Sequence, residues 1–170
     1  MGDKLVVAVL GNQNSGKSST WNSLFGADHE GGTVRTGKHE RHLHLNAAEW
    51  VNAFLVSGSA EERQRFIGKI LPRQLPDIVL CSMQYREDVI ETIDYFAEHR
   101  YDMFVVWLNP GFHDDRRYAD DLGLVDRLLR RGACVLQRSG KDDPSTRCRD
   151  IRQYVYGWAR FRNMLTTEFG

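Results

Sequence analysis

The chain has 170 residues, and its 23 lysine and arginine residues equal its 23 aspartate and glutamate residues in number. This length is typical of one α/β domain with a full hydrophobic core, so we expect residues 1–170 to form a single domain. The zero net charge excludes a global field that would attract nucleic acid or an anionic membrane surface.

The cysteines and the apolar runs predict a cytoplasmic protein. Cys81, Cys134 and Cys148 are an odd number without metal-ligand spacing, which indicates reduced thiols. The longest apolar run, residues 103–108, is too short to cross a bilayer. The acidic Asp3 and the early loop that follows are unlike a secretory signal peptide.

Strand and helix patterns alternate from the start of the chain. An apolar strand at residues 5–10 leads through a loop into a helix at about 17–25. The polar, glycine-rich stretch 27–37 is expected to be a mobile loop. Two strands follow at 40–45 and 50–56, with a connection between them that is short enough for a hairpin.

The rest of the chain continues the alternation. We expect helices at about 60–70, 87–100, 118–130 and 145–165, and strands at 78–82, 104–108 and 133–136. The pattern predicts an α/β fold, a P-loop NTPase three-layer sandwich with a six-stranded, mostly parallel sheet and one antiparallel hairpin strand. Because ligands bind at the carboxyl ends of parallel strands, the loops after residues 10, 56, 82, 108 and 136 should meet at one site.

The loop after the first strand is the most specific motif, a complete G-x-x-x-x-G-K-[ST] pattern. It reads Gly11-Asn12-Gln13-Asn14-Ser15-Gly16-Lys17-Ser18-Ser19. Gly11 and Gly16 allow turns that direct backbone N–H groups inward, and Lys17 supplies charge for the β- and γ-phosphates. The Ser18 hydroxyl is suited to Mg²⁺. All of these residues except Gln13 are candidate phosphate contacts, so the sequence predicts a nucleoside triphosphate as ligand.

The run from Gly11 to Gly26 resembles the opening of Era-type and ferrous-iron-transporter-type GTPases, G-N-x-N-x-G-K-[ST]-[ST]-x-x-N-x-L-x-G, at every fixed position. The order of elements is similar to the Ras-like G domain over most of the chain. This resemblance implies that a threonine in the mobile loop reaches Mg²⁺ and the γ-phosphate. Thr33 fits the family's local context and Thr36 fits the spacing from Ser18, so both are candidates.

The family's third motif, D-x-x-G, has no aspartate here. At the end of the second hairpin strand stand Ser57 and Gly58, and Leu55 or Val56 occupies the aspartate position. That aspartate normally holds a Mg²⁺-bound water. Ser57 is the uncharged candidate for this role, and the Gly58 N–H is a candidate donor to the γ-phosphate.

Charged residues follow at once. Glu61 and Glu62 either orient water or simply open a surface helix, where acids are favourable. The other strand expected to flank the first ends at Ser82, again without an acid. The arginines around the γ-phosphate side, one of which is a candidate internal arginine finger, are Arg63, Arg65, Arg73 and Arg86.

The base-reading motifs are incomplete. Asn109 stands where the fourth motif, N-K-x-D, begins, but Pro110 and Gly111 follow it, so Asn109 is either a base contact or turn chemistry. Asp114 or Asp115 would have to fold back to replace the missing guanine reader. The fifth motif, S-A-K, has a counterpart in Ser139-Gly140-Lys141, and Lys141 with Asp143 repeats the K-x-D spacing.

The leading hypothesis is a small NTPase that binds Mg²⁺ with GTP or ATP and hydrolyses the γ-phosphate slowly, with Lys17 stabilising transition-state charge. The loops near 30–37 and 57–65 would act as switches and contact a protein partner. Two alternatives remain open. One is a nucleotide or metabolite kinase, and the other is a non-catalytic pseudo-GTPase module, which the two absent aspartates favour.

Overall fold

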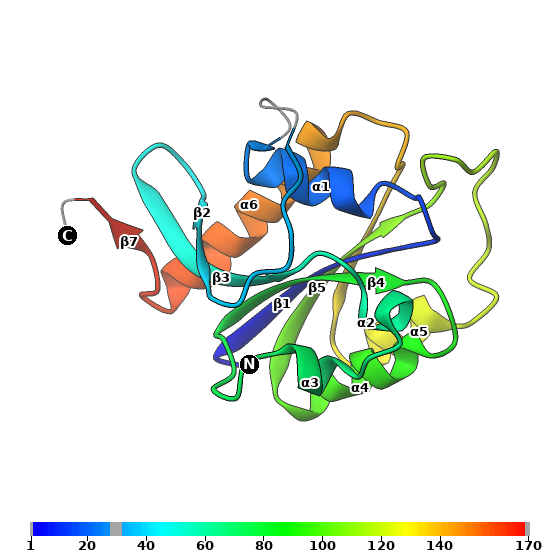
Figure 1. The fold of residues 1–170 in the computed structure, drawn as a ribbon, viewed down its shortest axis with the longest axis horizontal. Coiled ribbons are helices and arrows are strands. Elements are labelled where there is room, and N and C mark those ends of the chain that lie inside the picture. The colour runs from blue at the N-terminus through cyan, green and yellow to red at the C-terminus, as the bar shows by residue number, and fades with distance from the viewer. Residues whose placement is uncertain (1, 28–31, 169–170) are drawn as a thin grey trace.

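The computed structural model describes residues 2–27 and 32–168. Their strands form one sheet in the order β2-β3-β4-β1-β5-β6, and β7 pairs with the free side of β3 (Figure 1). The strands are β1 (Lys4–Gly11), β2 (Arg41–His44), β3 (Glu49–Val56), β4 (Ile78–Gln84), β5 (Tyr101–Leu108), β6 (Cys134–Arg138) and β7 (Thr166–Thr167).

The sheet is mostly parallel, as the sequence predicts. Strands β3, β4, β1, β5 and β6 run in one direction, whereas β2 forms an antiparallel hairpin with β3. The short strand β7 was not expected, and it is also antiparallel to β3. Strand β1 lies in the middle and is apolar on both sides, because residues 5–10 are fully buried.

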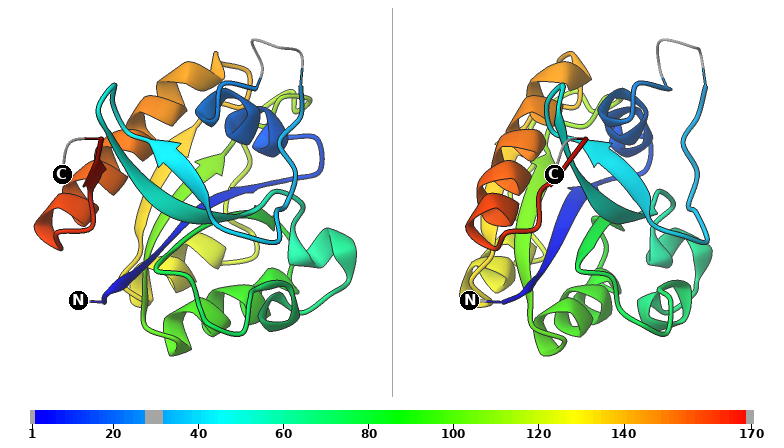
Figure 2. Two further views of the ribbon diagram at one scale, coloured as in Figure 1. Left: turned by 60° about the vertical axis from the view of Figure 1, so that its left-hand side comes forward. Right: turned by 90° about the vertical axis from the view of Figure 1, so that its left-hand side faces the viewer.

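Helices cover both faces of the sheet, which is compatible with the three layers expected (Figure 2). They are α1 (Lys17–Leu24), α2 (Ala60–Arg63), α3 (Ile67–Ile70), α4 (Val89–Glu98), α5 (Leu124–Arg130) and α6 (Pro144–Phe161). Alternate residues of β1 point into two separate apolar clusters. The cluster around Val7 includes α1 and α6, and the cluster around Val6 includes α2 to α5.

Three predicted helices have different bounds. The helix expected at 60–70 is broken into α2 and α3 at Gln64, whose φ of 52° ends the first helix in the left-handed conformation. The helix expected from residue 118 begins only at Leu124, because the Asp120 carboxylate accepts hydrogen bonds from the N–H groups of Leu124 and Val125. The last helix ends at Phe161, so its expected final turn instead leads to β7.

The sheet order corrects one expectation that matters for the site. The strands at 50–56 and 78–82 were both expected to flank the first strand, but β4 lies between β3 and β1. Strand β4 also continues past Ser82 to Gln84, which pairs with Gly11. Gly11 opens the loop of residues 11–19, called the phosphate loop here after the ligand that its sequence predicts. The position beside that loop is therefore occupied by the end of β4, and not by Ser57 or Ser82.

Residues 28–31, within the loop expected to be mobile, lie outside the described residues. From residue 32 onward the chain runs without regular structure to β2, and Val34 N–H donates to the Asn22 side chain on α1 at 2.8 Å. Cys81 and Cys134 are free thiols. Within residues 2–27 and 32–168, none of the helices has the length and apolar character of a membrane span.

Candidate functional site

The loop between β1 and α1 has the backbone that its glycines predict. Gly16 precedes the first helical residue. Its φ is 108°, a backbone conformation that residues with a Cβ rarely adopt. A Cβ on Gly11 would lie 2.3 Å from the Ser15 hydroxyl oxygen, so only glycine fits there. The Ser15 hydroxyl is buried, and within the described part of the chain it is the one such side-chain atom without a hydrogen-bond partner.

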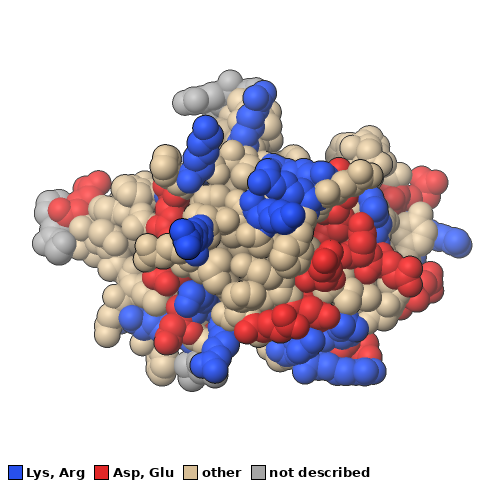
Figure 3. Space-filling model, turned by 60° about the horizontal axis from the view of Figure 1, so that its bottom comes forward, with Lys and Arg blue, Asp and Glu red and all other residues tan. Residues whose placement is uncertain are grey.

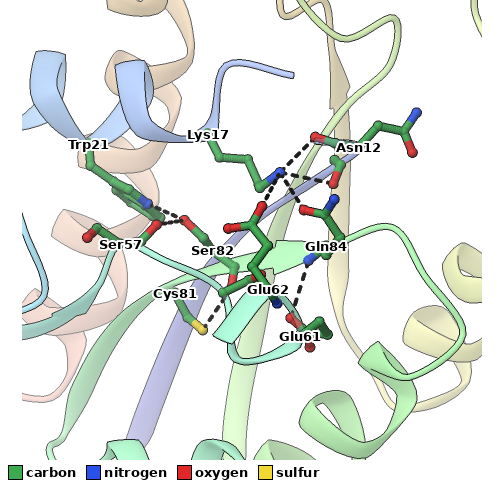
Figure 4. Close-up of polar contacts among 11 residues, drawn as sticks. Asn12, Lys17, Trp21, Ser57, Glu61, Glu62, Cys81, Ser82 and Gln84 are labelled. Atoms are coloured by element: carbon green, nitrogen blue, oxygen red, sulfur yellow. Dashed lines mark hydrogen bonds and ion pairs between the residues drawn. The ribbon is translucent and has the colours of Figure 1, made fainter. Parts of the chain in front are cut away.

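Lys17 is the charged group at the centre of the site, and its side chain is only 6% exposed. Its ammonium donates to the carbonyls of Gly11 at 3.1 Å and Asn12 at 2.7 Å, and to Gln84 Oε1 at 3.0 Å (Figure 4). The Glu62 carboxylate lies 3.8 Å away. Burial lowers the pKa of Lys17, and Glu62 opposes this shift.

A second buried cation supports the loop from α6. Arg147 is 1% exposed, and its guanidinium donates to Thr20 Oγ1 at 2.7 Å, to the Asp142 carbonyl at 3.2 Å and to the Gly16 carbonyl at 3.3 Å. These acceptors are uncharged. Burial lowers the pKa of Arg147 as well. Among the described residues no carboxylate pairs with this guanidinium, so a positive charge lies directly beneath the loop.

A cavity of about 740 Å³ opens above this loop, a size typical of small-molecule sites. Its wall is formed by residues 13–19 and by Ser57, Glu62, Gln84, Arg86, Phe112 and His113. The loops after β1, β3, β4 and β5 thus meet at one site, as the sequence predicts. The loop after β6 lies behind the phosphate loop instead, where Gly140 is so close that a Cβ would lie 2.1 Å from the Ser15 carbonyl.

The structure separates the two candidate threonines. Thr33 is exposed, whereas the Thr36 hydroxyl accepts a hydrogen bond from Ser57 N–H at 2.9 Å and lies 3.3 Å from Ser57 Oγ. Arg63 donates to the same Thr36 hydroxyl at 2.6 Å, and its guanidinium lies against Gly58. Thr36 therefore contacts Ser57, a residue of the cavity wall, whereas Thr33 does not line the cavity.

Ser57 is tied to α1 by a relay of polar groups. Trp21 Nε1 donates to Ser82 Oγ at 2.8 Å, and Ser82 Oγ donates to the Ser57 carbonyl at 2.7 Å (Figure 4). Trp21 is fully buried on α1, so its indole fixes the ends of β4 and β3 relative to the helix that follows the phosphate loop. Ser82 is a structural residue here.

The two adjacent glutamates point in different directions. Glu62 faces Lys17 and lines the cavity. Glu61 turns away and is buried, accepting from Thr92 Oγ1 at 2.7 Å and from Gln84 N–H at 3.4 Å. Burial raises the pKa of Glu61. Only Glu62 is placed to contact a ligand or a water molecule, and Glu61 supports the end of β4.

The residues expected at the base side have structural partners. The Asn109 amide donates to the Tyr118 carbonyl at 2.7 Å and accepts from Tyr118 N–H at 2.8 Å. Asp114 does fold back, but its carboxylate accepts from Gly111 N–H at 2.9 Å. Lys141 donates to the Phe112 carbonyl at 3.1 Å, and Ser139 accepts from Lys141 N–H at 3.2 Å.

Sequence reasoning missed several residues of the cavity. The strand predicted at 78–82 stops two residues short of Gln84, so the sequence does not mark this residue. The signal available is a polar residue that directly follows an apolar run. Phe112 and His113 follow β5, where the family resemblance points only to polar residues that read the base. No local pattern distinguishes the buried Arg147 from its exposed neighbours on α6.

The cavity contains side-chain oxygen atoms, the type of ligand that Mg²⁺ prefers. Ser18 is exposed at the start of α1, and Ser57 and Glu62 line the same space. Within the described ranges no three His, Cys, Asp or Glu side chains come together as a metal site. A Mg²⁺ ion here would therefore take most of its ligands from phosphates and water, which is its usual preference.

Charge is unevenly distributed outside the cavity. On the face at the bottom of Figure 1, basic and acidic side chains gather in separate patches (Figure 3). Helices α4 and α5 are joined by Asp94, which pairs with Arg127 at 2.7 Å and Arg131 at 3.0 Å. The hydrogen bond from Arg127 contributes most to lowering the pKa of Asp94.

The chain was compared with known protein families, curated proteins and solved structures. No protein-family model, no curated protein and no solved structure matches the chain.

Proposed function

We propose that the chain is a small P-loop NTPase that binds a magnesium–nucleoside triphosphate and hydrolyses it slowly. One observation carries the proposal: a cavity of about 740 Å³ whose floor is the loop from residue 13 to the start of α1, with the Lys17 ammonium at its edge. The N-terminus of α1 adds its positive end to the same place. The unpartnered Ser15 hydroxyl offers a ligand oxygen a further donor.

Each group in the cavity has a task in phosphoryl transfer to water. Lys17 would stabilise the charge that develops on the phosphoryl oxygens, and Ser18 would hold Mg²⁺. Glu62 is the best candidate to orient the attacking water and to take its proton, because its carboxylate faces Lys17 in the cavity wall. Arg86 lines the cavity as well and is the arginine best placed as an internal finger.

The switch proposal rests on the contact between two loops. Thr36 joins the loop before β2 to Ser57 after β3, and Arg63 at the end of α2 holds the same hydroxyl. A ligand that draws Thr36 or Ser57 toward a γ-phosphate and Mg²⁺ would break this junction and move both loops. A protein partner that reads the bound state would bind there.

A second candidate is a nucleotide-binding module without turnover. The ends of two strands favour it. Ser57 directly follows β3 and Gln84 ends β4, and neither residue carries the charge with which an aspartate places Mg²⁺. On this alternative Glu62 has no catalytic role.

Phosphate release from ATP and from GTP separates these functions. Wild type should release phosphate slowly, Lys17→Ala should lose nucleotide binding, and Glu62→Gln should retain binding while release falls by about 100-fold. Glu98→Gln, an exposed change on α4, is the matched control.

Other outcomes of the same assay would favour other functions. Binding without release in wild type would favour the non-catalytic module, and release unaffected by Glu62→Gln would remove Glu62 from the mechanism. Phosphate transfer that appears only when an acceptor metabolite is added would indicate a kinase. Failure of wild type to bind any triphosphate would overturn the proposal.

A further inference from the structure

At the proposed base end of the cavity lies Phe112, whose loop after β5 contacts both the phosphate loop and the loop after β6. Phe112 N–H donates to the Ser15 carbonyl at 3.0 Å, and the Lys141 ammonium donates to the Phe112 carbonyl at 3.1 Å. Gly140 N–H donates to the Pro110 carbonyl at 2.7 Å. The backbone of Phe112 is thus held between the phosphate loop and the loop after β6, while its side chain is left to the cavity.

The side chains expected to read the edge of a base are hydrogen-bonded to backbone groups of their own loop. Asn109 is only 3% exposed, and both ends of its amide bind the backbone of Tyr118. Asp114 is bound to Gly111 N–H, and the Asn12 amide donates to the same carboxylate oxygen at 3.4 Å. Neither Asn109 nor Asp114 belongs to the cavity wall. Among the described residues that line the cavity, the only carboxylate is that of Glu62, which faces Lys17, so none lines this end to select guanine.

What remains for a base is an aromatic face. The Phe112 side chain is 55% exposed although it is apolar, and it lines the same cavity as the phosphate loop. The His113 ring meets it edge to face, with 4.9 Å between the ring centroids. Every nucleobase has a π-face, so stacking on an aromatic side chain binds all of them.

The polar side chains nearby do not restore selectivity. Gln13 and Asn14 are exposed residues of the cavity wall, and each amide carries both a donor and an acceptor. Each of these amides can turn to complement the edge of any base, because no hydrogen bond within the described part of the chain holds either side chain.

From these contacts we propose that the nucleobase stacks on Phe112 and is not read by its edge, so that the site accepts nucleoside triphosphates of all four common bases. This inference rests on the proposed function, because it concerns the same bound ligand. It predicts that the phosphates supply most of the affinity and that the base adds a contribution of similar size for each nucleotide, with purines somewhat favoured by their larger ring.

Displacement of a fluorescent ATP analogue tests the inference, with Mg²⁺ salts of ATP, GTP, CTP, UTP and inorganic tripolyphosphate as competitors. The four nucleotides should bind within about tenfold of one another. Tripolyphosphate, which has no base, should bind more weakly by about tenfold or more. Phe112→Ala should weaken all four nucleotides to nearly the level of tripolyphosphate and leave tripolyphosphate binding unchanged. Phe112→Trp should retain tight nucleotide binding.

The matched control is Phe161→Ala, which removes a ring that is 74% exposed at the end of α6 and should change none of these affinities. The inference is overturned if wild type binds one nucleotide more than about 100-fold tighter than the others, a ratio that requires edge reading. It is also overturned if Phe112→Ala leaves nucleotide affinity unchanged. Failure of tripolyphosphate and all nucleotides to bind would instead remove the proposed function, and the inference with it.

Discussion

The two ends of the cavity are built on different principles. At the phosphate end, Lys17 and Arg147 are buried cations, and each is held by three hydrogen bonds to neutral oxygens. At the base end, the buried amide of Asn109 serves the loop itself, and the ring of Phe112 is exposed. Positive charge is thus held in place at one end, whereas the other end presents only an apolar ring on which a base could stack.

This difference shows why one motif is not enough to assign a ligand. A phosphate needs backbone N–H groups and a cation, which a loop of nine residues and the next helix can supply by themselves. Discrimination between bases needs a carboxylate or amide that the rest of the fold leaves free, and here the fold uses these groups for its own loops. The motif supports the proposed triphosphate and gives no information about the base.

Removing the ammonium from the phosphate end should have the largest effect. We expect Lys17→Ala to weaken Mg²⁺–tripolyphosphate and Mg²⁺–ATP alike by at least about 100-fold, because a charge-assisted hydrogen bond to phosphate is lost, about 3 kcal/mol. Titration calorimetry measures both ligands. Lys69→Ala on the surface of α3 is the control, and an equal loss in that variant would point to a nonspecific charge effect.

Removing the second cation tests whether the phosphate end is preorganised. Arg147→Met leaves the Asp142 carbonyl and the Thr20 hydroxyl without their donor, so we expect the free energy of unfolding to fall by about 2 kcal/mol. For a chain of this length, that lowers Tm by roughly 4–8 °C. Thermal unfolding with and without tripolyphosphate measures both effects, since the ligand should stabilise the variant less than wild type.

The control is Arg149→Met, two residues further along α6, where the side chain is exposed. If Arg147→Met unfolds at the temperature of Arg149→Met and gains the same stabilisation from tripolyphosphate, then Arg147 neither holds the loop nor adds to its charge.

The base end makes a more modest prediction. Asn109→Ala should lower the free energy of unfolding by about 1 kcal/mol, because two hydrogen bonds to the exposed Tyr118 backbone are replaced by bonds to water. Any loss of nucleotide affinity should be equal for GTP and ATP. Competition titrations of both nucleotides against the variant measure this, and a loss confined to GTP would restore Asn109 as a guanine reader.

The features that the sequence predicted well are local ones. The structure of residues 5–25 can be predicted from local sequence alone. An apolar strand, a turn that needs Gly11 and Gly16, and a helix follow one another there. The number of parallel strands and the hairpin were predictable for the same reason. In each case the signal is the period of apolar residues or a turn that few residue types permit.

The features that the sequence did not predict depend on distant contacts. The left-handed Gln64 that breaks the helix after β3 is not a glycine, and nothing local marks it. The loop before α5 is shaped by Tyr85, whose hydroxyl donates to Asp120 at 2.6 Å, and burial together with this bond raises the pKa of Tyr85 to about 12. Which of Glu61 and Glu62 faces the cavity is decided by Thr92 on α4.

The smallest effect is expected from Glu61, the carboxyl group that the cavity does not use. Burial raises its pKa, and the hydrogen bonds from Thr92 and Gln84 oppose that shift only in part. A carboxyl group with a raised folded-state pKa contributes stability below its unfolded pKa, near 4.5, and this contribution is lost as pH rises through the folded value. Glu61→Gln stays neutral at every pH, so its Tm relative to wild type should rise between pH 4 and pH 7, by on the order of 2 °C.

Thermal unfolding of Glu61→Gln and wild type across this pH range measures the difference, and the exposed Glu98→Gln should show none. A Tm difference that stays constant with pH would mean that Glu61 is as well stabilised in its charged form as it is in water. If the Tm of Glu61→Gln relative to wild type rises toward pH 7, the charged form of Glu61 destabilises the folded protein. Glu61 would then be retained for the support it gives to Gln84 N–H, the strand end that places a side-chain oxygen 3.0 Å from the Lys17 ammonium.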